Sequence, residues 1–186
     1  MEINRKDILL ILLYVPGIRG QCGEPIKGIT RLTKLLFLLN QIYKIDSYVG
    51  KYYSFEAHNY GPFTREIYDD LDFFDDLGFV EKKGEDSIQR EEYYILEEIF
   101  EDLLSFKEET ELLHQDSYKE IEFRLTARGR TFVEKMINQV PLIEKACIEV
   151  KKRFGSIPLT SLLRYVYKKY PNMAKESVRK DLLGVE

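Results

Sequence analysis

Cysteine, histidine and long apolar runs are all scarce in this sequence. Its two cysteines, Cys22 and Cys147, lie far apart, and neither belongs to a Cys-x-x-Cys pair. A zinc site would therefore need ligands that the sequence does not offer. We expect Cys147, which falls in an apolar helical pattern, to be a core residue. Cys22 lies in a glycine-rich turn and is interpreted as a free thiol in a reducing compartment.

The apolar runs are too short for a membrane protein. The longest, residues 8–15 and 35–39, fall well below the roughly 20 residues that a helix needs to cross a bilayer. The charged N-terminus before the first run resembles a signal peptide, but Pro16 and Gly17 follow and no small-residue cleavage site closes the run. We therefore expect a cytoplasmic protein without membrane contact.

No catalytic pattern is recognisable. His58 and His114 are the only histidines available for acid–base chemistry near neutral pH, and neither accompanies a serine or cysteine in a nucleophile setting. A phosphate loop, a dinucleotide fingerprint and an arginine–histidine pair at a four-residue gap are all missing. Carboxylates are dense in one stretch and three of them share a helix face, which allows a cation site, although a solvated acidic face is the favoured interpretation. These carboxylates are Asp69, Asp70, Asp72, Asp75 and Asp76. The sequence predicts a non-enzyme without cofactor or metal.

Charge, by contrast, is abundant and segregated. Charged residues make up 32% of the chain. Residues 66–122 contain five bases and twenty-one acids, whereas residues 145–180 contain ten bases and two acids. The basic end is either a docking surface for nucleic acid or an acidic partner, or a surface that packs against the acidic middle of the same chain.

Hydrophobic periodicity and capping residues predict a mainly α structure with small β hairpins, an α+β class. We expect helices over 4–14, 30–43, 64–78, 94–113, 126–137, 141–154 and 158–170, a short helix after residue 177, and strands over 48–58, 79–83 and 120–125. A strand that runs into Leu-Thr-x-x-Gly and a helix is frequent in winged-helix proteins. The chain is divided into a winged-helix-like core, 1–140, with an acidic insertion, 85–117, and a basic helical extension, 141–186, packed on that core.

Two groups of side chains are candidates for contacts with a partner. Lys27, Arg31 and Lys34 are three and four residues apart and so are expected on one exposed helix face, either facing phosphates or simply solvated. An aromatic group is either a docking surface or part of the core, and the core is favoured. It consists of Tyr52, Tyr53, Tyr60 and Phe63.

Residues 30–38, Thr-Arg-Leu-Thr-Lys-Leu-Leu-Phe-Leu, are followed about twenty residues later by Tyr60-Gly61-Pro62-Phe63. With 71–78, Leu125-Thr126-x-x-Gly129 and 165–171, this order resembles the YwgA-like proteins and the related Panacea (SocA-like) antitoxin domains. The resemblance implies a winged-helix-like scaffold and, for the Panacea branch, an antitoxin that neutralises a toxin by direct binding or by delivery to a protease. It assigns partner binding to Arg31, Lys34, Tyr60, Gly61, Pro62 and Phe63. The insertion 85–117 departs from the antitoxin pattern.

The sequence therefore predicts a non-enzymatic regulatory binding protein of the antitoxin or adaptor kind, with a protein partner such as a toxin or an assembly subunit. The alternative is a winged-helix transcriptional regulator that binds duplex DNA. For nucleic acid or an acidic partner, the predicted contacts are Lys27, Arg164, Lys168 and Lys169.

Overall fold

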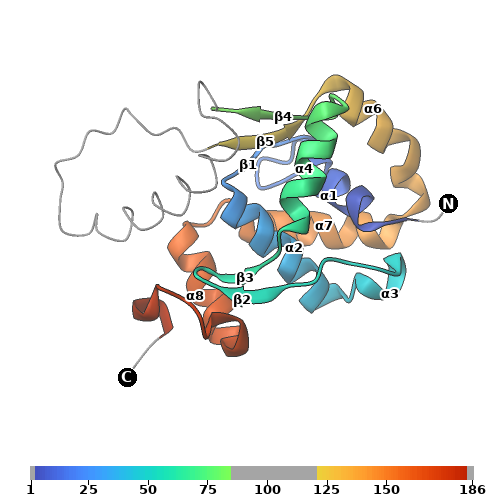
Figure 1. The fold of residues 1–186 in the computed structure, drawn as a ribbon. Coiled ribbons are helices and arrows are strands. Elements are labelled where there is room, and N and C mark those ends of the chain that lie inside the picture. The colour runs from blue at the N-terminus through green and yellow to red at the C-terminus, as the bar shows by residue number, and fades with distance from the viewer. Residues whose placement is uncertain (1–2, 85–120, 184–186) are drawn as a thin grey trace.

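The computed structural model describes residues 3–84 and 121–183, which form a mainly helical structure with two small antiparallel sheets (Figure 1). The α+β class expected from the sequence is confirmed. The helices are α1 (Arg5–Tyr14), α2 (Ile29–Tyr43), α3 (Asp46–Val49), α4 (Glu66–Asp76), α6 (Ala127–Met136), α7 (Pro141–Phe154) and α8 (Leu159–Lys169). The strands are β1 (Ile26–Lys27), β2 (Glu56–His58), β3 (Gly61–Phe63), β4 (Val80–Lys83) and β5 (Glu122–Leu125). Three 3₁₀ turns complete the description: η1 (Ile137–Gln139), η2 (Pro171–Ala174) and η3 (Lys180–Leu183).

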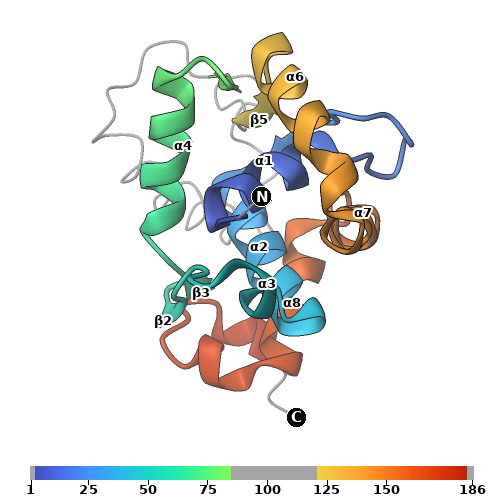
Figure 2. The ribbon, with the colours of Figure 1, turned by 90° about the vertical axis from the view of Figure 1, so that its right-hand side faces the viewer.

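Helix α1 is the centre of the molecule (Figure 2). The Asn4 side chain accepts hydrogen bonds from the backbone N–H groups of Lys6 and Asp7, and the Asp7 carboxylate accepts one from the Asn4 N–H. This reciprocal cap fixes the helix start that the sequence predicted. The six residues from Ile8 to Leu13 are fully buried, because α6, α7 and β5 all pack on the helix.

Helix α2 is also buried on nearly every side. It begins at Ile29, directly after Gly28, whose φ of 77° glycine adopts more readily than other residues. The N-cap residue is therefore Gly28 and not Thr30. Strand β1, strand β3 and helices α7 and α8 contact it from different directions. The expectation that Arg31 and Lys34 lie on an exposed face is therefore wrong. Ile42 is 37% exposed near the C-terminal end of the helix.

The three-stranded sheet has the order β1-β5-β4, and both pairs are antiparallel. Ile26 pairs with Phe123, and Val80 pairs with Leu125. The predicted strands 79–83 and 120–125 are thus confirmed to within two residues. The predicted acidic insertion, 85–117, and its helix, 94–113, lie outside the described residues. After β5, the Thr126 hydroxyl accepts a hydrogen bond from Gly129 N–H and caps α6, as expected.

The aromatic stretch 48–58 is not one strand. It contains the end of the short helix α3, and only β2 is extended, paired with β3. At the start of α3 the side-chain oxygen of Asn40 accepts a hydrogen bond from the Asp46 N–H at 2.9 Å. The hydroxyl of Tyr52 then donates to the Leu36 carbonyl inside the core. Gly61 and Pro62 are part of β3.

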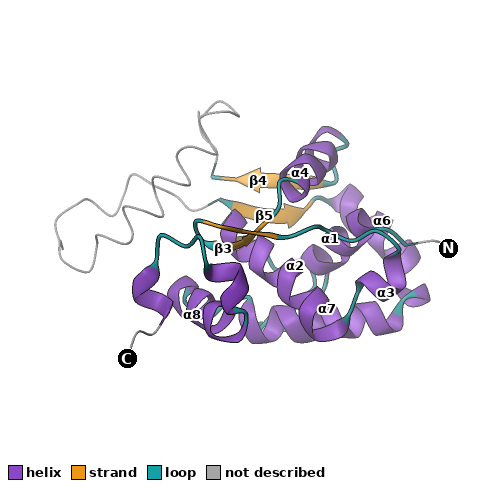
Figure 3. Ribbon diagram, turned by 60° about the horizontal axis from the view of Figure 1, so that its bottom comes forward, coloured by secondary structure: helices purple, strands orange, loops and turns teal. Residues whose placement is uncertain are grey.

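The C-terminal helices share the core with the N-terminal ones (Figure 3). Helix α7 packs on α1 and α2, and α8 packs on α2 and on η2. Gly155 separates the two helices, as predicted, and α8 ends before Pro171. Within residues 3–84 and 121–183, no helix has the length and apolar character needed to cross a bilayer.

Candidate functional site

Arg31 and Lys34, the basic residues of the resemblance motif, are buried inside the molecule. Lys34 is 3% exposed, and its Nζ donates to the Pro62 carbonyl at 3.2 Å. Arg31 is 9% exposed and donates from Nη1 to the Ile157 carbonyl at 2.6 Å. The prediction of an exposed face is wrong for both, because their long side chains reach backbone carbonyls distant in sequence. Lys27, in contrast, is solvent-accessible and pairs with Glu122 at 3.2 Å.

The Tyr60-Gly61-Pro62-Phe63 motif builds the β2–β3 hairpin and joins it to the C-terminal helices. Gly61 has a φ of 87°, and a Cβ there would lie 2.7 Å from the Tyr167 ring of α8. Tyr60 is buried, whereas Phe63 is half-buried and stacks on His58 with ring centroids 4.7 Å apart. The core interpretation of the aromatic group is confirmed for Tyr60, as it is for Tyr52 and Tyr53.

Asp70 is a buried carboxylate that the sequence assigned to a solvated acidic face. It is 1% exposed and accepts hydrogen bonds from Arg5 Nε and from the Tyr53 hydroxyl, each at 3.0 Å. Lys6 Nζ lies 3.7 Å away. The hydrogen bond to Asp70 raises the pKa of Arg5, and burial, together with the Asp70 charge, raises that of Tyr53 well above its ordinary value. These contacts connect α4 to α1 and to Tyr53, which precedes β2, and so stabilise the fold.

The outer surfaces of α4 and α6 form what we call the α4–α6 face. Its apolar centre is exposed: Phe73 is 44%, Leu77 37% and Phe132 39% accessible. The Phe73, Phe74, Phe79 and Phe132 rings follow one another at centroid distances of 5.1 to 6.1 Å. The helix predicted over 126–137 did not indicate the exposure of Phe132.

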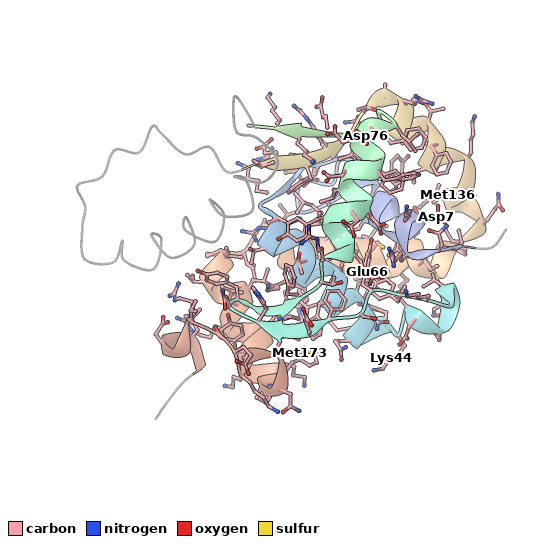
Figure 4. The ribbon with its side chains drawn as sticks, in the orientation of Figure 1. Asp7, Lys44, Glu66, Asp76, Met136 and Met173 are labelled. Atoms are coloured by element: carbon pink, nitrogen blue, oxygen red, sulfur yellow. The ribbon has the colours of Figure 1, made fainter. Side chains whose placement is uncertain are left out.

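Charges of opposite sign border this face. Asp69 and Asp76 are exposed along α4, whose end is marked by Asp76 in Figure 4. Arg128 and Lys135 are exposed on α6 and line a hollow of about 400 Å³ beside Phe132. The Arg128 guanidinium is fixed by a 2.9 Å hydrogen bond to the Leu77 carbonyl. An apolar centre with an acidic edge and a basic edge has the composition of a protein interface.

The predicted basic contacts of the C-terminal region lie on another side. Arg164, Lys168 and Lys169 are all exposed on α8, which packs on α2, β3 and the C-terminal turns. Among the described residues, α4 makes its extensive contacts with β4, and α7 and α8 make theirs with other elements. The described acids of α4 are therefore not covered by the basic helices.

Lys151 of α7 is a buried cation that sequence analysis counted only as part of the basic end. It is 2% exposed, and its Nζ donates to the carbonyls of Leu13, at 2.9 Å, and Val15, at 2.8 Å. Burial lowers its pKa to about 7. Helical spacing could have indicated that Lys151 is buried. It lies on the same face of α7 as Cys147 and Phe154, which are both core residues.

Within residues 3–84 and 121–183, no group of three or more metal-binding side chains comes together. Of the predicted cation-site carboxylates, Asp72 binds Lys82 at 2.7 Å. His114 lies outside the described residues. Cys147 is buried in the core as expected, and Cys22 is an exposed free cysteine.

No family model, curated protein or solved structure matched this chain. The resemblance to the YwgA-like and Panacea proteins therefore stays a prediction, and the site is argued from its own geometry.

Proposed function

We propose that this protein is a non-enzymatic regulatory protein, antitoxin- or adaptor-like, that binds a protein partner through the α4–α6 face. The observation that carries the proposal is the exposure of three large apolar side chains, Phe73 and Leu77 of α4 and Phe132 of α6, with Arg128 of α6 bonded to the Leu77 carbonyl. Exposed aromatic side chains that gather in this way are typical anchors of protein interfaces, where a few such residues supply most of the binding energy.

The element order supports a winged-helix-type core as part of this proposal. Helix α1, strand β1, helices α2 and α4 and the strands β4 and β5 occur in this order, with α3 and the β2–β3 hairpin between α2 and α4, and β5 lies in the middle of the sheet. In such a core, the helix before the last two strands corresponds to the helix that reads DNA in helix-turn-helix proteins. Here that helix is α4.

Helix α4 is chemically unsuited to that task. Its eleven residues, Glu-Ile-Tyr-Asp-Asp-Leu-Asp-Phe-Phe-Asp-Asp, include six acids and no base. Phosphates would be repelled by this surface, whereas a protein with a basic and apolar surface complements it. We infer that a surface used for DNA in other proteins of this architecture serves a protein partner here, which fits neutralisation of a basic toxin by occupation of its functional surface.

Duplex DNA is the second candidate partner, favoured by the exposed bases of α8. Arg164 and Lys168 lie four residues apart on one face, and Lys169 adjoins them. If this surface binds DNA, Arg164→Ala with Lys168→Ala reduces the slope of log affinity against log salt by about 2, because each lost phosphate contact removes about 0.9. Arg31 and Lys34 are buried and would not contribute direct contacts.

Affinity purification from the native host tests the protein-partner proposal. The tagged protein and its Phe73→Asp/Leu77→Asp variant are purified after nuclease treatment, and the bound proteins are quantified by mass spectrometry. Leu142→Asp is the matched control, because Leu142 is 65% exposed on α7, away from this face. We expect one basic protein to be retained by the wild type and the control and lost by the double variant. Equal recovery with all three would refute the proposal.

A further inference from the structure

A cavity of about 410 Å³ opens between the loop before β1, the start of α2 and the C-terminal end of α7. Its volume falls within the range of small-molecule sites, roughly 300 to 1,000 Å³. The cavity is separate from the α4–α6 face and has no part in the proposed function. Its lining includes Arg19, Lys27, Arg31 and Lys151.

The buried Lys151 ammonium has only neutral partners at hydrogen-bond distance. Both of its acceptors are backbone carbonyls, of Leu13 and Val15, and within residues 3–84 and 121–183 no carboxylate oxygen lies within the 4 Å of an ion pair. Buried charges in proteins are normally paired or bound to an ion. A third N–H of the protonated amine is left for a ligand.

The two acids that line the cavity, Glu24 and Glu122, already have partners. The Glu24 carboxylate accepts hydrogen bonds from the backbone N–H groups of Gly17, Arg19 and Gln21, at 3.0 to 3.3 Å, and so shapes the loop. Glu122 pairs with Lys27. The lining thus contains four basic side chains and two carboxylates, a formal net charge of +2 when Lys151 is protonated, and a phosphate dianion carries the opposite charge.

We propose that this cavity binds a small phosphate-bearing molecule whose phosphate lies against Lys151. The apolar wall of Ile18, Pro25 and Ile26 is available to the rest of such a molecule. The bound anion would place a counter-charge at hydrogen-bond distance from the amine, where the described residues offer only the carbonyls of Leu13 and Val15.

Binding is consequently coupled to a proton. Burial lowers the pKa of Lys151 to about 7, an effect that the negative charge of the nearby Glu24 carboxylate opposes. At pH 8 the amine is mostly neutral, and a phosphate beside it raises its pKa again. The complex should therefore take up close to one proton per site.

Isothermal titration calorimetry with inorganic phosphate at pH 8, in two buffers of different ionisation enthalpy, tests the proposal. We expect one saturable site with uptake of about one proton. Lys151→Met should weaken binding at least about tenfold and abolish the proton uptake. Lys152→Met, a change at the exposed neighbouring position, should leave both unchanged.

A second variant pair keeps the test valid if Lys151→Met does not fold. Ser156 is exposed on the cavity wall, so Ser156→Asp adds a repelling charge without disturbing the core, and Ser156→Asn has the same size without the charge. We expect the first to weaken phosphate binding several-fold and the second to preserve it. Absence of saturable binding to the wild type, or binding insensitive to both Lys151→Met and Ser156→Asp, would overturn the proposal.

Discussion

Asp70 of α4 accepts two hydrogen bonds from Arg5 of α1, from Nε at 3.0 Å and from Nη2 at 3.3 Å. This bidentate pair connects the most buried helix to the helix that carries the proposed binding face. The Glu66 carboxylate, at the other end of α4 from Asp76 (Figure 4), also binds Arg5. The exposed surface of α4 is therefore held rigidly, which lowers the entropic cost of binding a partner.

Replacing the Asp70 carboxylate should destabilise the protein strongly. Asp70→Asn leaves the Arg5 guanidinium without its main counter-charge and weakens the hydrogen bond from Tyr53. We expect the free energy of unfolding to fall by about 3 kcal/mol, as when one member of a buried pair is removed. Urea unfolding followed by circular dichroism measures it. The control is Asp69→Asn, on the exposed side of α4, with an effect of about 0.5 kcal/mol or less. Equal effects would contradict this role for Asp70.

Gly61 is required by the close approach of the hairpin to α8. Gly61→Ala places a methyl group 2.7 Å from the Tyr167 ring at a φ of 87°. We expect a loss of about 3 kcal/mol in unfolding free energy, of which about 1 kcal/mol comes from the backbone conformation and the rest from overpacking. Gly50→Ala separates the two effects, because Gly50 also has a positive φ, of 67°, but open space around it. If both variants lost the same stability, Tyr167 would not constrain this position.

Lys151 should make stability depend on pH. Its folded-state pKa, about 7, lies below the ordinary lysine value of about 10.4 that applies to the unfolded chain. Between these values the unfolded state binds more protons, so stability rises with pH. We expect the wild type to gain stability relative to Lys151→Met by up to about 1.4 kcal/mol per pH unit from pH 7 to 9.5. Thermal and urea unfolding of both proteins across this window measures the difference. A constant difference would show that the amine is not titrating there.

The helix ends were predictable because their signals are local. Asn4 and Thr126 accept hydrogen bonds from N–H groups two or three residues away. Such local contacts can be predicted from the residue type and its position before the helix. The order of β4, β5 and α6 followed from equally local alternation and capping.

The direction of the basic side chains was not predictable from helical spacing. That argument assumes one buried face and one solvated face, whereas α2 is surrounded by other elements. Arg31 donates to the Lys27 carbonyl four residues away and to the Ile157 carbonyl 126 residues away, and the acceptor of Lys34 lies 28 residues away. Only the tertiary structure brings the distant acceptors close. Asp70 was missed for the same reason, because its partner Arg5 is 65 residues distant.

The α4–α6 face could not be predicted from the sequence of α4, in which phenylalanines and acids are close together. Phe74 points into the core and Phe73 out of it, with 4% and 44% exposure. The two phenylalanines are consecutive residues of one amphipathic helix. Helical spacing alone did not assign the outward-pointing Phe73 to a surface.

Photo-crosslinking in the native host tests the central claim most directly. A photoreactive phenylalanine analogue replaces Phe73 in one strain and Leu142 in another, and cross-linked products are identified by mass spectrometry. Both positions are exposed, so the photoreactive residue should not disturb folding at either position. Binding through the α4–α6 face predicts one dominant protein adduct from position 73 and none from position 142. No adduct from position 73, or the same adducts from both positions, would contradict it.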